Sequence, residues 1–347
     1  MRGLLPKVAY LCALALLAGC APDRAAISDA VREDGGPLIV LADEQAGLEA
    51  AIAPDQGGEL TSLRVRRQGE WIETLHRARD YSGQPGWRGK ALFLWPATGR
   101  NFPAGFAIPA GGREGAWDFQ GERYPMPIHG FAGHMPWTVE SRRDGFVALS
   151  LRDTGETRRV YPFGFTLTAQ YRIERGALSI TYYVQAAADN QHAMPFSIGN
   201  HITFRTPLIE GGDPGALWIQ TPSTVEYLKR PPGLPTGETR PRSLDRPVRL
   251  ADLPAKESVS LGGYAGDPWL EYRDPRGMAL RITQNTSGPA EGPVVRFNLW
   301  GDPSQGYYSP EPWVGMPNSL VSGKGLIKVE AGESWRWRIV IEPSRGR

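Results

Sequence analysis

One carboxylate in this chain is held between two prolines, in the run Tyr308-Ser309-Pro310-Glu311-Pro312-Trp313. Proline fixes φ and has no N–H, so the pattern predicts that Glu311 lies on a stiff, extended backbone. The indole of Trp313 follows directly and offers an aromatic face. A rigid acid beside an aromatic face suits a sugar, because the C–H faces of a sugar stack on rings while its hydroxyl groups need acceptors.

Two upstream histidines have neighbours that favour proton transfer. His129 precedes Gly130, which allows close approach of backbone or ligand, although a purely structural histidine fits equally well. His201 follows Asn200 at the expected start of a strand. A neutral imidazole has one donor and one acceptor, so a neighbour such as Asn200 must hold its ring. If both histidines converge with Glu311, the chemistry is proton transfer on a carbohydrate.

Arg100, in Gly99-Arg100-Asn101, is the candidate for holding substrate oxygens. Its planar guanidinium group suits the ring oxygen and hydroxyl groups of a sugar. A surface arginine in a turn fits the same pattern. His134 runs into the next strand and is a weaker candidate, and the remaining two histidines are expected to be solvated.

Several other kinds of site are excluded by their missing motifs. The chain has no glycine-rich phosphate loop, no Cys-x-x-Cys, no His-Glu-x-x-His and no Gly-x-Ser-x-Gly. A formal net charge of +2, with basic residues scattered among acids, gives no case for nucleic acid. We therefore expect neither a metal nor a cofactor.

The first residues have the form of a secretory signal. A basic start is followed by an apolar run over 8–17 and by Leu17-Ala18-Gly19-Cys20. The run is too short for a membrane span and typical of a signal peptide. Its ending resembles a bacterial lipobox, in which Cys20 is lipidated and residues 1–19 are removed. An ordinary signal peptide that contains a cysteine is the alternative. The lipobox predicts a periplasmic protein that meets the membrane only through its lipid.

The predicted cleavage and lipidation leave no thiol for a disulfide, a metal or nucleophilic catalysis. Of the two cysteines, Cys12 lies in the removed segment and Cys20 carries the lipid. The protein must then be stabilised by a large core, which its length permits. Residues 20–36, rich in Ala, Asp and Gly, are predicted to form a tether. Residues 37–347 are predicted to form one domain.

Alternation of apolar and polar residues predicts antiparallel strands. Glu174-Arg175-Gly176 is expected to be a hairpin turn and 250–254 a short helix. The runs 229–235 and 238–242 are expected to be loop, within a long excursion between strands. With 42 Gly and 31 Pro, the chain has too many breakers for long helices. These observations predict an all-β sandwich. The clearest strands are expected at 146–151, 165–173, 177–184, 278–282, 294–300 and 335–341.

Taken in order, the motifs resemble those of the aldose 1-epimerases, the galactose mutarotase-like superfamily, and within them a bacterial branch with Glu-Pro-Trp. The resemblance runs from about residue 36 to the C-terminus and implies a large antiparallel β-supersandwich with a sugar cleft on a concave sheet. The matching motifs are Gly57-Gly58-Glu59-Leu60, Gly99-Arg100, His129-Gly130-Phe131, Tyr161-Pro162-Phe163, Asn200-His201 and Glu311-Pro312-Trp313.

The resemblance also implies roles in ring opening. Glu311 corresponds to the base that takes the anomeric proton, and His201 to the acid that protonates the ring oxygen. His129 and Arg100 correspond to residues that bind sugar oxygens, and Trp313 to a ring that stacks on the sugar. We expect Glu311 to lie across the sugar from His201 and not to pair with it. A neighbouring group should keep His201 able to donate near neutral pH.

Two departures and three rival functions accompany this resemblance. The family's additional aspartate after the second histidine has no counterpart here, and Asn318 stands where the branch often has aspartate; Asn318 is expected to contact the sugar. The rivals are a non-catalytic sugar-binding lipoprotein, a hexose-6-phosphate epimerase, and a lyase or hydrolase. The phosphate rival needs a basic pocket and a substrate that is scarce outside the cytoplasm. The identity of the sugar and the oligomeric state are left open.

Overall fold

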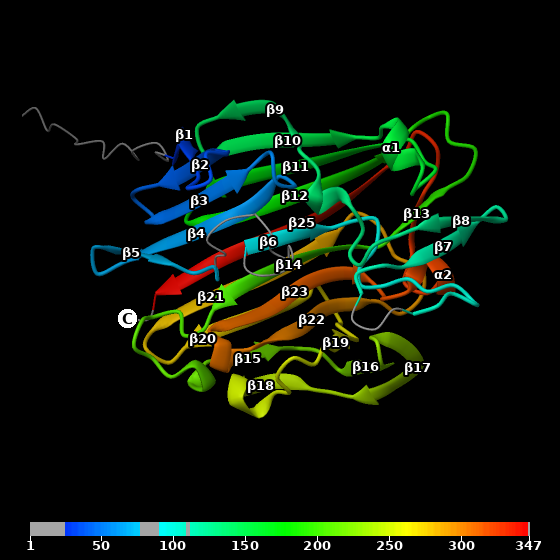
Figure 1. The fold of residues 1–347 in the computed structure, drawn as a ribbon. Helices are drawn as coiled ribbons and strands as arrows, with labels where there is room; N and C mark the ends of the chain where they lie inside the picture. Colours follow the sequence, from blue (N-terminus) through cyan, green and yellow to red (C-terminus); the bar gives the residue numbers. More distant parts are fainter. Residues whose placement is uncertain (1–24, 77–89, 109–111, 346–347) are drawn as a thin grey trace, which may run out of the picture.

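The computed structural model describes residues 25–76, 90–108 and 112–345. In this part of the chain, two large antiparallel sheets form the layers of a sandwich, which confirms the predicted all-β supersandwich (Figure 1). The larger sheet has the order β1 (Ala25–Val31), β2 (Pro37–Asp43), β3 (Leu48–Ala53), β4 (Glu59–Arg67), β6 (Lys90–Leu94), β14 (Ile198–Arg205), β23 (Tyr307–Gly315), β22 (Val295–Asp302), β19 (Val259–Gly262), β16 (Val225–Arg230) and β17 (Leu234–Pro241), and β5 (Glu70–Glu73) pairs with β4.

The second sheet contains most of the strands that alternation predicts. Its order is β18 (Leu244–Arg249), β15 (Trp218–Thr221), β20 (Trp269–Asp274), β21 (Met278–Thr286), β25 (Ser334–Arg345), β12 (Ala177–Ala186), β11 (Phe165–Glu174), β10 (Phe146–Arg152) and β9 (Thr138–Arg143). Two small sheets pair β7 (Ala116–Phe119) with β8 (Glu122–Pro125), and β13 (Met194–Phe196) with β24 (Ile327–Val329).

Helices in the described residues are short. They are α1 (Gly155–Arg158), α2 (Ser319–Ser322) and 3₁₀ turns, one of which, η3 (Leu250–Asp252), confirms the short helix predicted at 250–254. The predicted hairpin turn is also confirmed, with Arg175 and Gly176 both at positive φ between β11 and β12. Within the described ranges, no helix has the length and apolar composition needed to cross a membrane.

Aromatic side chains fill the space between the two sheets. Phe93 on β6 stacks on Tyr182 on β12, with 4.4 Å between ring centroids. Tyr182 in turn stacks against Trp337 on β25. All three rings are buried, and truncating one such ring to alanine typically costs about 3–5 kcal/mol. This core supplies a rigid support for the outer face of the larger sheet.

The alternation of side chains along β6 shows which face of the larger sheet carries the candidate site residues. Phe93 points into the core between the sheets, whereas Leu92 and Leu94 belong to a second hydrophobic cluster that includes Trp313. Successive residues of a strand point to opposite faces, and paired residues on neighbouring strands share a face. His201 pairs with Leu92 and therefore lies on the outer face with Trp313.

The structure corrects the expected start of the domain. Part of the segment predicted as a tether is strand β1, which pairs with β2 along its whole length, from Ala25 with Asp43 to Val31 with Pro37. Ile27 packs against the main core. The Ala- and Asp-rich composition conceals a short edge strand, so the domain includes residues from 25 onward. Residues 1–24, including Cys20, lie outside the described residues.

The predicted loop runs at 229–235 and 238–242 are wrong, because β16 and β17 form a hairpin there. Lys229 pairs with Pro235, and Arg230 pairs with Leu234. Proline is tolerated on an edge strand, and β17 is the last strand in the order of the larger sheet. The hairpin places Lys229 on a strand, directed at the same outer face as the site below.

Candidate active site

A row of side chains crosses the middle strands of the larger sheet. Leu92 on β6 pairs with His201 on β14, and Glu311 on β23 pairs with Asn298 on β22. Asn298 pairs next with Ser260 on β19. Because paired residues share a face, the strand register alone places His201, Glu311 and Asn298 beside one another on the outer face.

The two prolines that flank Glu311 open a gap in this sheet. Pairing between β14 and β23 stops after Trp313 and resumes at Tyr308, whereas β23 and β22 are paired throughout this stretch. Proline cannot donate to a neighbouring strand and is normally absent from central strands. In this register Glu311 stands opposite His201 inside the gap. The prolines thus give the acid an extended backbone, as predicted, and also separate the strands at the site.

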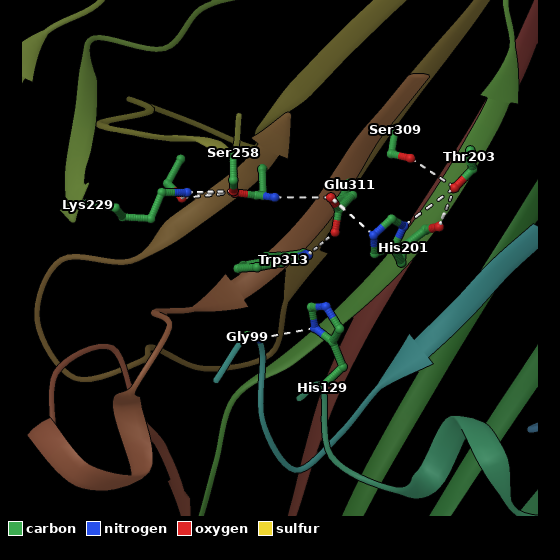
Figure 2. Close-up of polar contacts among 11 residues, drawn as sticks. Gly99, His129, His201, Thr203, Lys229, Ser258, Ser309, Glu311 and Trp313 are labelled. Carbon is green, nitrogen blue, oxygen red and sulfur yellow. Dashed lines mark hydrogen bonds and ion pairs between the residues drawn. The ribbon is translucent and has the colours of Figure 1, made fainter. Parts of the chain in front are cut away.

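Glu311 and His201 are close neighbours. His201 Nε2 lies 3.7 Å from Glu311 Oε1, and the two side chains are 6% and 1% exposed. The expectation that they lie across the sugar from each other is therefore wrong, because the register makes them adjacent (Figure 2). The distance exceeds that of a hydrogen bond, which leaves substrate oxygens free to engage each group.

Both carboxylate oxygens of Glu311 accept hydrogen bonds from fixed donors. Asn298 Nδ2 donates to Oε1 at 3.0 Å, and Trp313 Nε1 donates to Oε2 at 3.0 Å. These bonds favour the ionised carboxylate. Trp313 lies on the same face of β23 two residues further on, so the Glu-x-Trp spacing itself brings the indole N–H to the acid.

Burial shifts the pKa values of the pair in opposite directions. It raises the pKa of Glu311 to about 8 and lowers the pKa of His201 to about 4. Each shift favours the uncharged form. Near neutral pH the pair therefore holds one proton, on either Glu311 or His201, and it titrates as a unit. A hydrogen bond to its own backbone raises the pKa of His201, as a hydrogen bond was expected to do, but burial outweighs it, and the proton that His201 needs is held by Glu311.

The ring of His201 is oriented by Thr203 and not, as predicted, by Asn200. Thr203 Oγ1 lies 3.4 Å from His201 Nδ1 and also donates to the His201 carbonyl oxygen. Asn200 points to the opposite face, where its Nδ2 donates to Ala91 O and Tyr182 Oη. His201 lies within β14 and not at its start. One step along a strand reverses the face, which explains the difference.

His129 adopts a left-handed conformation, with φ of 69°, and Gly130 follows at 73°. Its Nδ1 accepts a hydrogen bond from the Gly99 N–H at 3.1 Å, so the neutral ring carries its proton on Nε2. Burial, and then the nearby charge of His201, lower the pKa of His129 well below its usual value. His129 is thus a neutral hydrogen-bond donor beside the acid–base pair (Figure 2).

Replacing Gly130 with Ala is expected to destabilise the protein by at least about 2 kcal/mol. A Cβ at this position would lie 2.2 Å from the carbonyl oxygen of Trp95, and positive φ adds strain. Gly105→Ala is the matched control, because it has similar φ and no atom within 4 Å of the added Cβ. Urea unfolding measures both variants. Equal losses would contradict a close-packing role for Gly130.

Arg100 is held by backbone carbonyls at the wall of the site. Its guanidinium donates to Gly112 O at 3.3 and 3.1 Å and to Pro232 O at 3.1 Å. Burial lowers its pKa, although an arginine remains charged. Of its five N–H groups, these contacts use three. Arg100 can therefore still donate to a ligand from a fixed position.

Asn318 is placed differently from the prediction. Its Oδ1 accepts from the Phe102 N–H, and its own N–H donates to the Arg100 carbonyl oxygen, each at 2.8 Å. It adopts φ of 62° just before α2 and does not line the cavity. Asn318 therefore supports the loop that carries Arg100 instead of facing a sugar.

Most of the Trp313 ring is covered. The residue is 3% exposed and packs with Leu92, Leu94 and Met316 in the outer hydrophobic cluster. It still lines the cavity, but Trp300, which is partly exposed, offers more ring surface there. The His201 ring meets Trp300 edge-on, with centroids 5.8 Å apart.

A cavity of about 700 Å³ brings these groups together, a volume suited to a small ligand. It includes every residue predicted to bind or act on the sugar except Asn318, namely Arg100, His129, His201, Glu311 and Trp313. In the described part of the chain, no cluster of His, Cys, Asp and Glu side chains could hold a metal ion.

Sequence reasoning missed Lys229, Ser258, Asn298 and Trp300, which also line the cavity. Asn298 and Trp300 alternate with buried Phe297 and Leu299 on β22, so their shared outer face could have been found from the alternation. Lys229 could not, because its segment was interpreted as a loop.

Comparison with known proteins identifies the family. The family model described as aldose 1-epimerase matches residues 37–252, which is more than half of the chain. The chain belongs to the aldose 1-epimerase family. The matched segment contains Arg100, His129 and His201 and ends before Glu311.

Relatives of this aldose 1-epimerase family member are distant. It is 25% identical to the plasmid-encoded protein LacX of Lactococcus lactis subsp. lactis over 287 residues, covering 78% of this chain and 86% of LacX. An Escherichia coli K12 protein, named as a candidate glucose-6-phosphate 1-epimerase, is 37% identical over 92 residues, covering 24% of this chain and only 31% of that protein. A galactose mutarotase-like protein from Clostridium acetobutylicum has the same fold, with a TM-score of 0.76, 20% identity and coverage of 93% and 99%.

Proposed function

We propose that this protein is an aldose 1-epimerase that interconverts the α and β anomers of a free hexose or a related sugar, in the branch that carries Glu-Pro-Trp. The observation that carries the proposal is the pair of buried groups, His201 Nε2 and Glu311 Oε1, 3.7 Å apart in the cavity wall. Membership of the aldose 1-epimerase family supports it.

Ring opening begins when the shared proton has passed from Glu311 to His201, which leaves Glu311 ionised and His201 protonated. Glu311 takes the proton of the anomeric hydroxyl, the C1–O5 bond breaks, and O5 takes the proton of His201. The products are an aldehyde at C1, a hydroxyl at C5, protonated Glu311 and neutral His201. Rotation about C1–C2 and reversal of both proton transfers then close the other anomer. No proton is gained or lost over the cycle.

The adjacency of the two groups fits this chemistry. The anomeric oxygen and the ring oxygen are both bonded to C1, so the acid and the base that serve them must also be close together. A sugar that enters with this edge first meets Glu311 and His201 side by side. The Nε2–H of His129 and the remaining N–H groups of Arg100 are available to its hydroxyl groups.

Positioned acids and bases each contribute typically about 10²–10⁴-fold to a rate. Anomer exchange already proceeds in water, so two such groups suffice for an efficient catalyst without a further reactive group. The pair also gives a bell-shaped pH dependence. Activity falls at low pH, where both groups are protonated, and at high pH, where neither is.

We also propose that the protein is anchored in the periplasm by a lipid on Cys20. The support is the basic start, the short apolar run and the Leu17-Ala18-Gly19-Cys20 ending. Mass spectrometry of the membrane fraction tests it. A diacylated N-terminal Cys20 is expected in the wild type, and Cys20→Ser should release the protein or leave its signal uncleaved.

Polarimetry and NMR exchange spectroscopy with a panel of aldoses test the activity. We expect anomer exchange faster than in buffer for at least one neutral hexose, with saturation kinetics. A protein that binds sugars and accelerates none of them is the non-catalytic sugar-binding lipoprotein. Inclusion of pentoses and hexuronates in the panel defines which substituents the cavity accepts.

One observation favours a second candidate, an epimerase of sugars with an anionic group. Arg100 and Arg230 line the cavity, and within the described residues no ion pair joins either of them to an acid. The hexose-6-phosphate rival needed a basic pocket, which these residues supply. Aldose 6-phosphates in the same panel test it, because a salt-sensitive preference for them over neutral hexoses is expected only for this candidate.

A further inference from the structure

Lys229 extends the site away from the sugar. From β16 its ammonium donates to Ser258 Oγ at 2.5 Å, to Ser260 Oγ at 2.8 Å and to Asn298 Oδ1 at 3.4 Å (Figure 2). An ammonium group has three N–H donors and no acceptor. Each donor has a protein acceptor, so Lys229 has none left for a ligand although it lines the cavity.

The hydrogen bonds around Lys229 all run in one direction. The hydroxyl groups of Ser258 and Ser260 accept from the ammonium, so each is left to donate to Asn298 Oδ1, at 2.7 and 2.9 Å. The carbonyl end of the Asn298 amide is thereby occupied. Its Nδ2 end faces the acid and donates to Glu311 Oε1.

If the side-chain amide of Asn298 were flipped, so that its NH₂ group and its carbonyl oxygen changed places, both ends would face groups that repel them. Its NH₂ group would face the ammonium of Lys229, and its carbonyl oxygen would face the carboxylate of Glu311. Only the positive charge of Lys229 makes the first of these contacts repulsive, since hydroxyl groups alone can reverse and accept from an NH₂ group. The cation therefore selects one orientation of the amide.

We infer that Lys229 is a positioning residue, which acts through Asn298 to keep a hydrogen-bond donor on the catalytic carboxylate and to favour its ionised form. The inference rests on the proposed function in assigning Glu311 as the base. Burial lowers the pKa of Lys229 to about 8, and the charges of Glu311 and Glu226 oppose this shift, so Lys229 is a cation at neutral pH.

The groups that face Glu311 come from four strands. His201 approaches from β14, Asn298 with Lys229 behind it from β22 and β16, and Trp313 lies on β23 itself, whose Tyr308 belongs to the main core. His129 lies beyond His201 and Trp313 and is neutral. Lys229 is the cation that this set holds constantly below its own pKa, since near neutral pH His201 is charged only when it, and not Glu311, holds the shared proton.

Lys229→Met is the direct test, because it keeps the length of the side chain and removes its charge. The Glu311 carboxyl is expected to titrate at least about one pH unit higher than in the wild type, which makes the ionised acid about tenfold rarer at pH 7. Infrared difference spectroscopy, with Glu311→Gln to assign the band, measures this titration. Anomer exchange at pH 7 should fall about tenfold in kcat, with its alkaline limit moved upward.

Two further variants keep the test decisive. Lys229→Arg retains the charge and should restore most of the titration position. The double variant Ser258→Ala and Ser260→Ala keeps the lysine but removes both hydroxyl groups, and should move the Glu311 titration in the same direction by a smaller amount. Thermal melting establishes that each variant is folded, and the double variant carries the test if Lys229→Met does not fold.

An unchanged Glu311 titration in folded Lys229→Met would overturn the inference. A higher KM with an unchanged pH profile would also overturn it, because Lys229 would then be a sugar-binding residue. The infrared measurement needs no turnover. A wild type without epimerase activity therefore contradicts the proposed function alone, and the Glu311 titration still decides the role of Lys229.

Discussion

Replacing Glu311 with Gln is expected to slow anomer exchange by about 10²–10⁴-fold while the sheet stays folded. The amide keeps the shape of the acid and can still accept from Asn298 or Trp313, but it cannot take the anomeric proton. The loss should appear in kcat more than in KM, because the proton is transferred only in the transition state. NMR exchange spectroscopy at a saturating sugar concentration measures it.

Glu257→Gln is the matched control for this variant. Glu257 also lines the cavity, but it is exposed at the rim, outside the row that holds the acid–base pair. The same chemical change there should alter the rate by less than about threefold, because it removes no proton-transfer group. Equal losses at the two positions would show that general charge in the cavity, and not proton transfer at Glu311, supports the reaction.

His201→Gln is expected to have the second-largest effect, a fall of about 10²–10⁴-fold. The amide fills a similar volume but cannot deliver a proton to the ring oxygen. The rate of the double variant, His201→Gln with Glu311→Gln, should be only slightly below that of the less active single variant. The two losses do not add because both groups serve one concerted exchange of a proton. Polarimetry across pH 5–9 measures all three.

The pH profile of His201→Gln separates catalysis from structure. Without the histidine, the bell-shaped dependence should reduce to a single titration of Glu311, whose pKa is raised to about 8 by burial. Its rate should then rise with pH through that value as the carboxylate forms. His192→Gln is the control, since His192 is exposed and does not line the cavity. A bell-shaped profile retained in His201→Gln would contradict the assignment of its acid.

Local sequence patterns predicted the inner strands of the sheets reliably but missed strands at the sheet edges. The predicted strands on β10, β11, β12, β21, β22 and β25 are confirmed, because two-residue alternation reports directly on a half-buried strand. The segments at 25–31 and 229–242 were misjudged, since edge strands need little apolar alternation and tolerate proline.

The site shows the same division between local and long-range information. Glu311, His201, His129 and Arg100 each belong to a short motif whose residue types suit sugar chemistry, and all four line the cavity. Lys229 carries no such motif. Its contact with Asn298 joins residues 69 positions apart, and only the pairing of β16, β19 and β22 brings them together.

By itself, the sequence determined the all-β fold and the set of reactive side chains, because alternation, turns and short motifs act over a few residues. Only the tertiary structure decided that Glu311 stands directly beside His201, and that the prolines part β14 from β23 at that point. Strand register and burial are collective properties of the whole sheet. They make one buried proton common to an acid and a histidine that lie 110 positions apart in the chain.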